Sequence, residues 1–146
     1  VGKRGSARMR REVRHFRPQE FVCPCCGAGQ PAALLVLWLE GLREAWGGPV
    51  VVNSGFRCER HNAEVGGARR SRHLVGCAAD VRPAEGSMED FARLVRRLGS
   101  LSGWELRFYG TFVHVGVPRR EAGRLWSGGE EEAGPEDPLT GSGDCV

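Results

Sequence analysis

The segment Ser71-Arg72-His73-Leu74-Val75-Gly76-Cys77-Ala78-Ala79-Asp80 places a histidine and an aspartate seven positions apart. This spacing is too long for one helical turn to pair the two side chains, so the chain must bend between them. Gly76 supplies the backbone freedom for a bend, and Ala78 and Ala79 are small enough to let the backbone pass close to a bound ion. We therefore expect Asp80 to leave from the start of a short strand.

A second histidine lies in an apolar stretch, Phe112-Val113-His114-Val115, that alternates as a β-strand does. Phe112 and His114 share one face of that strand, and the two valines share the other. Two histidines and an aspartate can form a catalytic zinc site that leaves a fourth position for water. In such a site zinc lowers the pKa of the bound water to about 7. The pattern predicts zinc bound by His73, Asp80 and His114.

The remaining chain predicts an α+β domain with a small antiparallel sheet flanked by helices. Apolar residues recur at helical spacing after Pro31, and Ser87 can cap a second amphipathic helix that ends at Gly99. The segment 55–72 is rich in glycine, arginine and asparagine and is expected to be largely irregular. The expected elements are helices at 31–46 and 87–98, single helical turns at 59–65 and 119–126, strands at 49–53 and 78–82, and a hairpin at 104–117.

Composition predicts one domain with charged ends. The chain has 146 residues, of which 40% are hydrophobic and 27% charged, and no apolar run approaches the roughly 20 residues of a membrane span. Residues 1–14 carry a charge of +5, and residues 127–146 carry −6. We expect a flexible basic arm at 1–14, a domain at 15–126 and a disordered acidic, glycine-rich tail at 127–146. The arm is interpreted as solvated, so nucleic acid is not an expected partner.

Three phrases resemble the zinc D-alanyl-D-alanine carboxypeptidase family, which includes D,D-dipeptidases of vancomycin resistance and phage endolysins and shares the Hedgehog fold. They are Ser54-Gly55-Phe56-Arg57, Ser71-x-His73-x-x-Gly76-x-Ala78-x-Asp80 and Phe112-Val113-His114-Val115. The sequence segments that begin at His15 and at Arg57 are similar to those of the small phage-type branch of this family. The resemblance covers about Phe16 to Trp126.

The resemblance implies a zinc metallopeptidase that cuts peptidoglycan stem peptides with zinc-activated water, as a D-Ala-D-Ala carboxypeptidase or an endolysin-like enzyme. We expect it to be a monomer. It implies that His73, Asp80 and His114 are the zinc ligands, that Arg57 stabilises the oxyanion, and that Ser71 helps to hold the substrate. No apolar signal-peptide stretch follows the basic N-terminus. We therefore expect synthesis in a bacterial cytoplasm or from a prophage, with action at the cell wall.

One departure from the family concerns the general base. The resemblance implies a carboxylate three residues before the second zinc histidine or two residues after it, but these positions hold Thr111 and Gly116. Glu105, on the preceding strand, could reach across as a replacement, although a solvent-facing position is slightly favoured. The alternative function is a catalytically weakened or inactive zinc-binding module that binds cell-wall peptide or a protein partner.

The cysteines permit three states. Cys23, Cys25 and Cys26 are close in sequence, and with Cys58 they could form a second, structural zinc site of four thiolates. A disulfide from this group to Cys58 would suit an enzyme outside the reducing cytosol. Reduced, buried thiols are the third state, and the sequence does not favour the zinc site over the other two. Cys77 is interpreted as a packing residue.

Overall fold

A computed structural model describes residues 13–128. Almost all of the predicted acidic tail and of the predicted basic arm lie outside the described residues. The elements, in chain order, are the 3-10 helix η1 (Pro18–Phe21), helix α2 (Ala33–Trp46), strand β1 (Val50–Ser54), helix α3 (Glu59–Glu64), the 3-10 helix η2 (Arg72–Val75), strand β2 (Ala78–Pro83), helix α4 (Met88–Leu98), strands β3 (Glu105–Phe108) and β4 (Val113–Gly116), and the 3-10 helix η3 (Arg119–Gly123).

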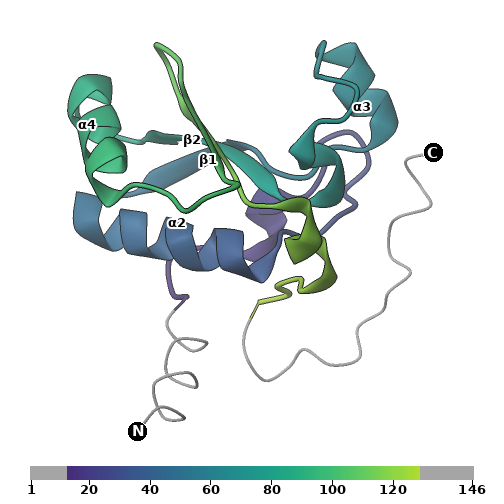
Figure 1. Cartoon of the computed structure of the whole chain (residues 1–146), viewed down its shortest axis with the longest axis horizontal. Coiled ribbons are helices and arrows are strands. Elements are labelled where there is room, and N and C mark those ends of the chain that lie inside the picture. Colours follow the sequence, from purple (N-terminus) through teal and green to yellow (C-terminus); the bar gives the residue numbers. More distant parts are fainter. Residues whose placement is uncertain (1–12, 129–146) are drawn as a thin grey trace, which may run out of the picture.

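The four strands form one antiparallel sheet in the order β1-β2-β4-β3. Helix α2 runs along the sheet, and α4 and α3 lie towards opposite ends of the molecule (Figure 1). The α+β class and the small antiparallel sheet predicted from the sequence are confirmed. The expected strands and the two longer helices are found within about two residues of their predicted bounds. Among the described residues, no helix is long and apolar enough to cross a membrane.

The main core lies between the sheet and the helices α2 and α4. Helix α2 contributes Leu35 and Leu39, α4 contributes Phe91, and β4 contributes Val113 and Val115, all of them completely buried. Because successive side chains of a strand point to opposite faces, the two valines of β4 leave His114 on the other face of the sheet. The alternation predicted for this strand therefore separates the core from the site.

The bend before β2 occurs at Gly76, as the sequence predicts. Gly76 has φ +76° and ends η2, and its N–H donates to the carbonyls of Arg72 and His73. A Cβ at this position would lie 2.2 Å from the carbonyl oxygen of Gln30. Both the left-handed backbone and the close approach require glycine here. The helix η2 was not predicted, because four residues are too few to show an apolar period.

Candidate metal centre

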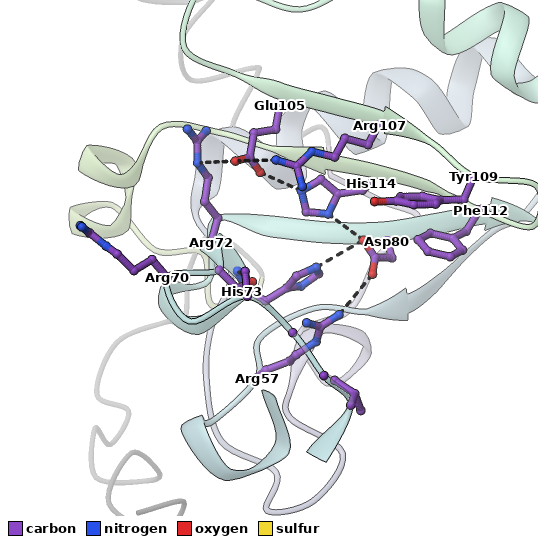
Figure 2. Close-up of a pocket in the computed structure, with 15 residues that line it drawn as sticks. Arg57, Arg70, Arg72, His73, Asp80, Glu105, Arg107, Tyr109, Phe112 and His114 are labelled. Atoms are coloured by element: carbon purple, nitrogen blue, oxygen red, sulfur yellow. Dashed lines mark hydrogen bonds and ion pairs between the residues drawn. The ribbon is translucent and has the colours of Figure 1, made fainter. Parts of the chain in front are cut away.

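The structure brings the three predicted ligands together on the face of the sheet opposite the core. Asp80 and His114 are directly paired across β2 and β4, and His73 reaches them from η2. Asp80 Oδ1 lies 2.9 Å from His114 Nδ1 and 3.3 Å from His73 Nε2 (Figure 2). All three residues are buried, and their candidate ligand atoms lie within 4.8 Å of one another. One ion can therefore contact all three side chains.

The hydrogen bonds of His73 fit a bound cation. Its Nδ1 lies 2.7 Å from the carbonyl oxygen of Gly55, which can only accept, so Nδ1 carries the proton. In the neutral ring, Nε2 then carries a lone pair, and this lone pair faces the carboxylate of Asp80. The two atoms lie 3.3 Å apart and repel each other unless a proton or a metal ion lies between them. The donor set of two imidazoles and a carboxylate suits zinc.

The second histidine is held from both sides. His114 Nε2 lies 2.8 Å from Glu105 Oε1, while its Nδ1 faces Asp80. A metal on Nδ1 would leave Nε2–H to donate to Glu105, which is the carboxylate–histidine–metal arrangement that orients ligand histidines. Arg72 Nε and Arg107 Nη2 lie 3.3 Å and 3.6 Å from Glu105 Oε2. The Glu105 carboxylate is therefore fixed by three neighbours.

Burial and hydrogen bonding act in opposite directions on the acidic groups. Burial raises the pKa of Asp80, but hydrogen bonds from His114 and His73 outweigh it and hold that pKa well below its usual range. Burial also raises the pKa of Glu105, and the hydrogen bond from His114 and the charge of Arg72 lower it overall. Both carboxylates are thus ionised at neutral pH, and Asp80 is ready to bind a cation.

Zinc affinity is expected to rise with pH through a window above about pH 6.5. Burial lowers the pKa of His114, but hydrogen bonds to Asp80 and Glu105 raise it overall. A proton and zinc compete for Nδ1, so affinity falls as pH drops below this raised pKa and levels off above it. Competition titrations with a chromophoric chelator measure the effect. Glu105→Gln removes one anionic neighbour and should move the window to lower pH, whereas a pH-independent affinity would contradict this assignment.

Arg57 lies at the edge of the metal centre and is held in one orientation. Its Nε donates to Ser54 Oγ at 3.1 Å, Nη1 donates to Asn62 Oδ1 at 3.0 Å, and Nη2 lies 3.4 Å from Asp80 Oδ2. The side chain is 14% exposed. A guanidinium fixed in this way has little freedom to lose when it meets an anionic group. The structure thus places Arg57 beside the candidate ligands, and its role towards an oxyanion stays a prediction.

The three candidate ligands line a pocket of about 500 Å³. Arg57, Arg70, Arg72 and Arg107 supply its positive charge, against the carboxylates of Asp80 and Glu105. At one side Tyr109 and Phe112 stack with their ring centroids 4.6 Å apart (Figure 2). The pocket therefore combines basic groups with an apolar wall. Sequence reasoning missed Arg72, Arg107 and Tyr109, although Arg107 shares the strand face of Glu105 by simple alternation.

Ser71 has a structural contact as well as a place in the pocket. Its hydroxyl accepts the backbone N–H of His73 at 3.1 Å and caps η2. This is a local turn contact of the kind that serine often makes. Ser71 also lines the pocket, so its role in holding a substrate stays a prediction.

Position 116 explains how Glu105 comes to face the pocket. Glu105 and Gly116 are directly opposite in the pairing of β3 with β4, and a Cβ at 116 would lie 2.9 Å from Glu105 Oε1. The Glu105 side chain is 24% exposed and is bonded to His114, so the solvent-facing position slightly favoured from the sequence was wrong. Thr111 is exposed and is not among the residues that line the pocket.

Gly116→Asp is expected to weaken the centre by about tenfold in zinc affinity, because a second carboxylate would crowd and repel Glu105 across the strand pair. The double variant Glu105→Ala/Gly116→Asp moves the carboxylate from one strand to the other and should bind zinc more tightly than Gly116→Asp alone. Chelator competition compares the variants. Unchanged affinity in Gly116→Asp would show that the two side chains do not share this space.

Two comparisons relate this chain to known proteins. A family model described as Peptidase M15 matches residues 14–116. A zinc D-Ala-D-Ala carboxypeptidase of Streptomyces albus G is 36% identical over 97 residues. That match includes 65% of this chain, and the chain spans 38% of the relative's length. The family match contains the three candidate ligands, Arg57 and Glu105.

Proposed function

Because the chain belongs to the peptidase M15 family, which includes zinc D-Ala-D-Ala carboxypeptidases, we propose that it is a zinc-dependent peptidase acting on peptidoglycan stem peptides at a bacterial cell wall. The buried cluster of His73, Asp80 and His114 beside a fixed Arg57 carries this proposal. The relative is named for its action on D-Ala-D-Ala, and we extend that substrate class to this chain. An endolysin-like role, with synthesis in a bacterial cytoplasm or from a prophage, is part of the same proposal.

In the proposed reaction, the metal ion and the pocket side chains would have separate roles. A zinc ion held by His73, Asp80 and His114 would polarise the scissile carbonyl and lower the pKa of water. Arg57 is positioned to donate N–H groups to the oxygen on which negative charge develops. Asp80 and Ser54 hold its guanidinium, so little reorganisation is needed during the reaction.

The basic pocket supports a substrate with a free carboxylate. Arg107 is 58% exposed and lies 3.6 Å from Glu105, so its guanidinium has N–H groups left to donate to a second carboxylate. Ser71 lines the same pocket. The apolar wall of Tyr109 and Phe112 suits the small side chains of alanine residues. We therefore propose that the C-terminal carboxylate of the stem peptide is bound here and that cleavage is of the carboxypeptidase type.

Digestion of a stem pentapeptide and of whole peptidoglycan tests the proposal. A zinc-loaded carboxypeptidase releases free D-alanine from the pentapeptide, and an endopeptidase instead releases new amine termini from cross-linked wall. The absence of both products, with zinc bound, would contradict a peptidase. Binding of the same pentapeptide without hydrolysis would then favour the non-catalytic zinc module that the residues Thr111 and Gly116 suggest.

Glu105→Gln is expected to lower zinc affinity by about 10- to 100-fold while leaving most of the hydrolysis rate at saturating zinc. Glu105 is bonded to His114 and paired with Arg72, and its pKa is lowered, which fits a positioning residue better than a proton acceptor. Metal titration and the rate at saturating zinc separate the roles. A loss of about 10²- to 10⁴-fold in rate with unchanged zinc affinity would assign the general base to Glu105 instead.

A further inference from the structure

A second group of metal-binding side chains lies outside the catalytic pocket, in a small separate core. Cys23 and Cys58 are buried there with Ala28, and Phe56 packs against them. The sulfur of Cys23 lies 3.6 Å from those of Cys25 and Cys58, and the latter two sulfurs are 3.3 Å apart. Three free thiols thus form a nearly equilateral triangle.

We propose that Cys23, Cys25 and Cys58 bind a structural zinc ion. Zinc–sulfur bonds of about 2.3 Å place the sulfurs of a tetrahedral site about 3.8 Å apart, close to the separations seen here. An ion at that bond length would rest about 1 Å out of the plane of the three sulfurs. A disulfide between any two of these cysteines would leave the third thiol against it, whereas one zinc ion uses all three.

The loop that carries Cys23 and Cys25 is built as a tight turn. The N–H of Cys23 donates to the carbonyl of Ala28 at 2.8 Å, and the N–H of Gly27 donates to the carbonyl of Cys23 at 2.7 Å. Gly27 has φ +76°, which a glycine adopts without strain. These bonds hold the two sulfurs on the same side of the loop, facing Cys58, which lies 35 positions away from Cys23.

Neighbouring donors suit thiolates at this position. The backbone N–H of His61 donates to the Cys58 sulfur at 3.4 Å, and the backbone amides of Cys58 and Cys25 lie near the Cys23 sulfur. The Arg60 guanidinium lies near Cys25 and offsets negative charge on the cluster. N–H groups and a cation around the sulfurs are the outer contacts that stabilise thiolate ligands.

Access is also compatible with zinc, and three thiolates would leave the fourth position of a tetrahedral ion to water at the exposed side. Cys25 is exposed, so an ion can enter from the surface, while Cys23 and Cys58 are shielded from solvent. The sulfur of Cys26 lies within 4.8 Å of the other three, but Cys26 is disulfide-bonded, and we assign only the three thiols. Soft thiolate ligands favour zinc over magnesium or calcium. This site does not depend on the proposed peptidase activity.

Metal analysis of purified protein tests the site. The parent is expected to hold about two zinc ions per chain, and Cys25→Ser and Cys58→Ser about one. Because Cys25 is exposed, Cys25→Ser keeps the test valid if Cys58→Ser does not fold. Cys77→Ala changes a buried cysteine outside the cluster and serves as the control that should keep both ions.

Cobalt substitution adds a readout independent of hydrolysis. Sulfur-to-cobalt charge-transfer absorption should be present in the parent and in His114→Ala but absent in Cys25→Ser. An identical zinc content in the parent and Cys25→Ser would overturn the proposal. A disulfide between any two of the three assigned cysteines, found by peptide mapping without reduction, would also overturn it. If the site is confirmed but no peptide is cleaved, only the proposed function fails.

Discussion

His114→Ala is expected to remove zinc from the candidate metal centre and to lower the proposed stem-peptide hydrolysis by about 10³-fold or more, since metal stabilisation is worth several kcal/mol. The substitution deletes the Nδ1 atom that lies 2.9 Å from Asp80. It also leaves the buried Asp80 carboxylate with one fewer partner, which weakens what remains of the site. Alanine on the pocket face of β4 leaves the core valines on the other face untouched, so the fold should persist.

Zinc content, circular dichroism and hydrolysis rate are measured together for this variant. Thr111→Ala is the matched control, because Thr111 lies near the same strand, is exposed and does not line the pocket. It should keep zinc and activity. A His114→Ala protein that hydrolyses stem peptide at the parent rate would show that the cluster is not the catalytic centre.

Arg57→Ala is expected to lower kcat by about 10²- to 10³-fold with zinc still bound, the range seen when one oxyanion donor is removed. Arg57→Lys should recover little of this loss. A lysine cannot reproduce the fork that contacts Ser54, Asn62 and Asp80 together. Reported separately, kcat and KM distinguish a donor in the transition state from a group that binds substrate in the ground state.

Arg82→Lys provides the control for this change. Arg82 lies on β2 near Asp80 and makes one exposed hydrogen bond, to Asn53, at 3.1 Å. It should leave kcat unchanged. A rise in KM for Arg57→Ala with constant kcat would place Arg57 in substrate binding alone, and loss of zinc would make it a support for Asp80.

Much of the site could be predicted because it follows short-range rules. Alternation along β4 separates His114 from the valines of the core, and Gly76 marks the bend that brings His73 back towards Asp80. These relations depend only on neighbours in sequence. The joining of His114 to the other two candidate ligands does not follow from these rules, and the resemblance to the zinc carboxypeptidase family implied it.

The contacts of Glu105 could not be predicted in the same way. Its position opposite Gly116 depends on the register of β3 against β4, and its pairing with Arg72 joins two segments that are distant in the sequence. Single positions do not determine either relation. The approach of Cys58 to the other cysteines was among the states that the sequence left open, and the fold brings its sulfur to 3.6 Å from that of Cys23.

The cross-strand position of Glu105 limits which insertions and deletions this protein can accept during evolution. A slip of one residue between β3 and β4 would turn Glu105 to the core face and expose Leu106 to the pocket. Length changes in the turn at 109–112 are therefore tolerated only when they bulge outward and keep the pairing. Natural variants should carry extra residues beyond the strand ends, because a longer turn there does not change the register of β3 against β4.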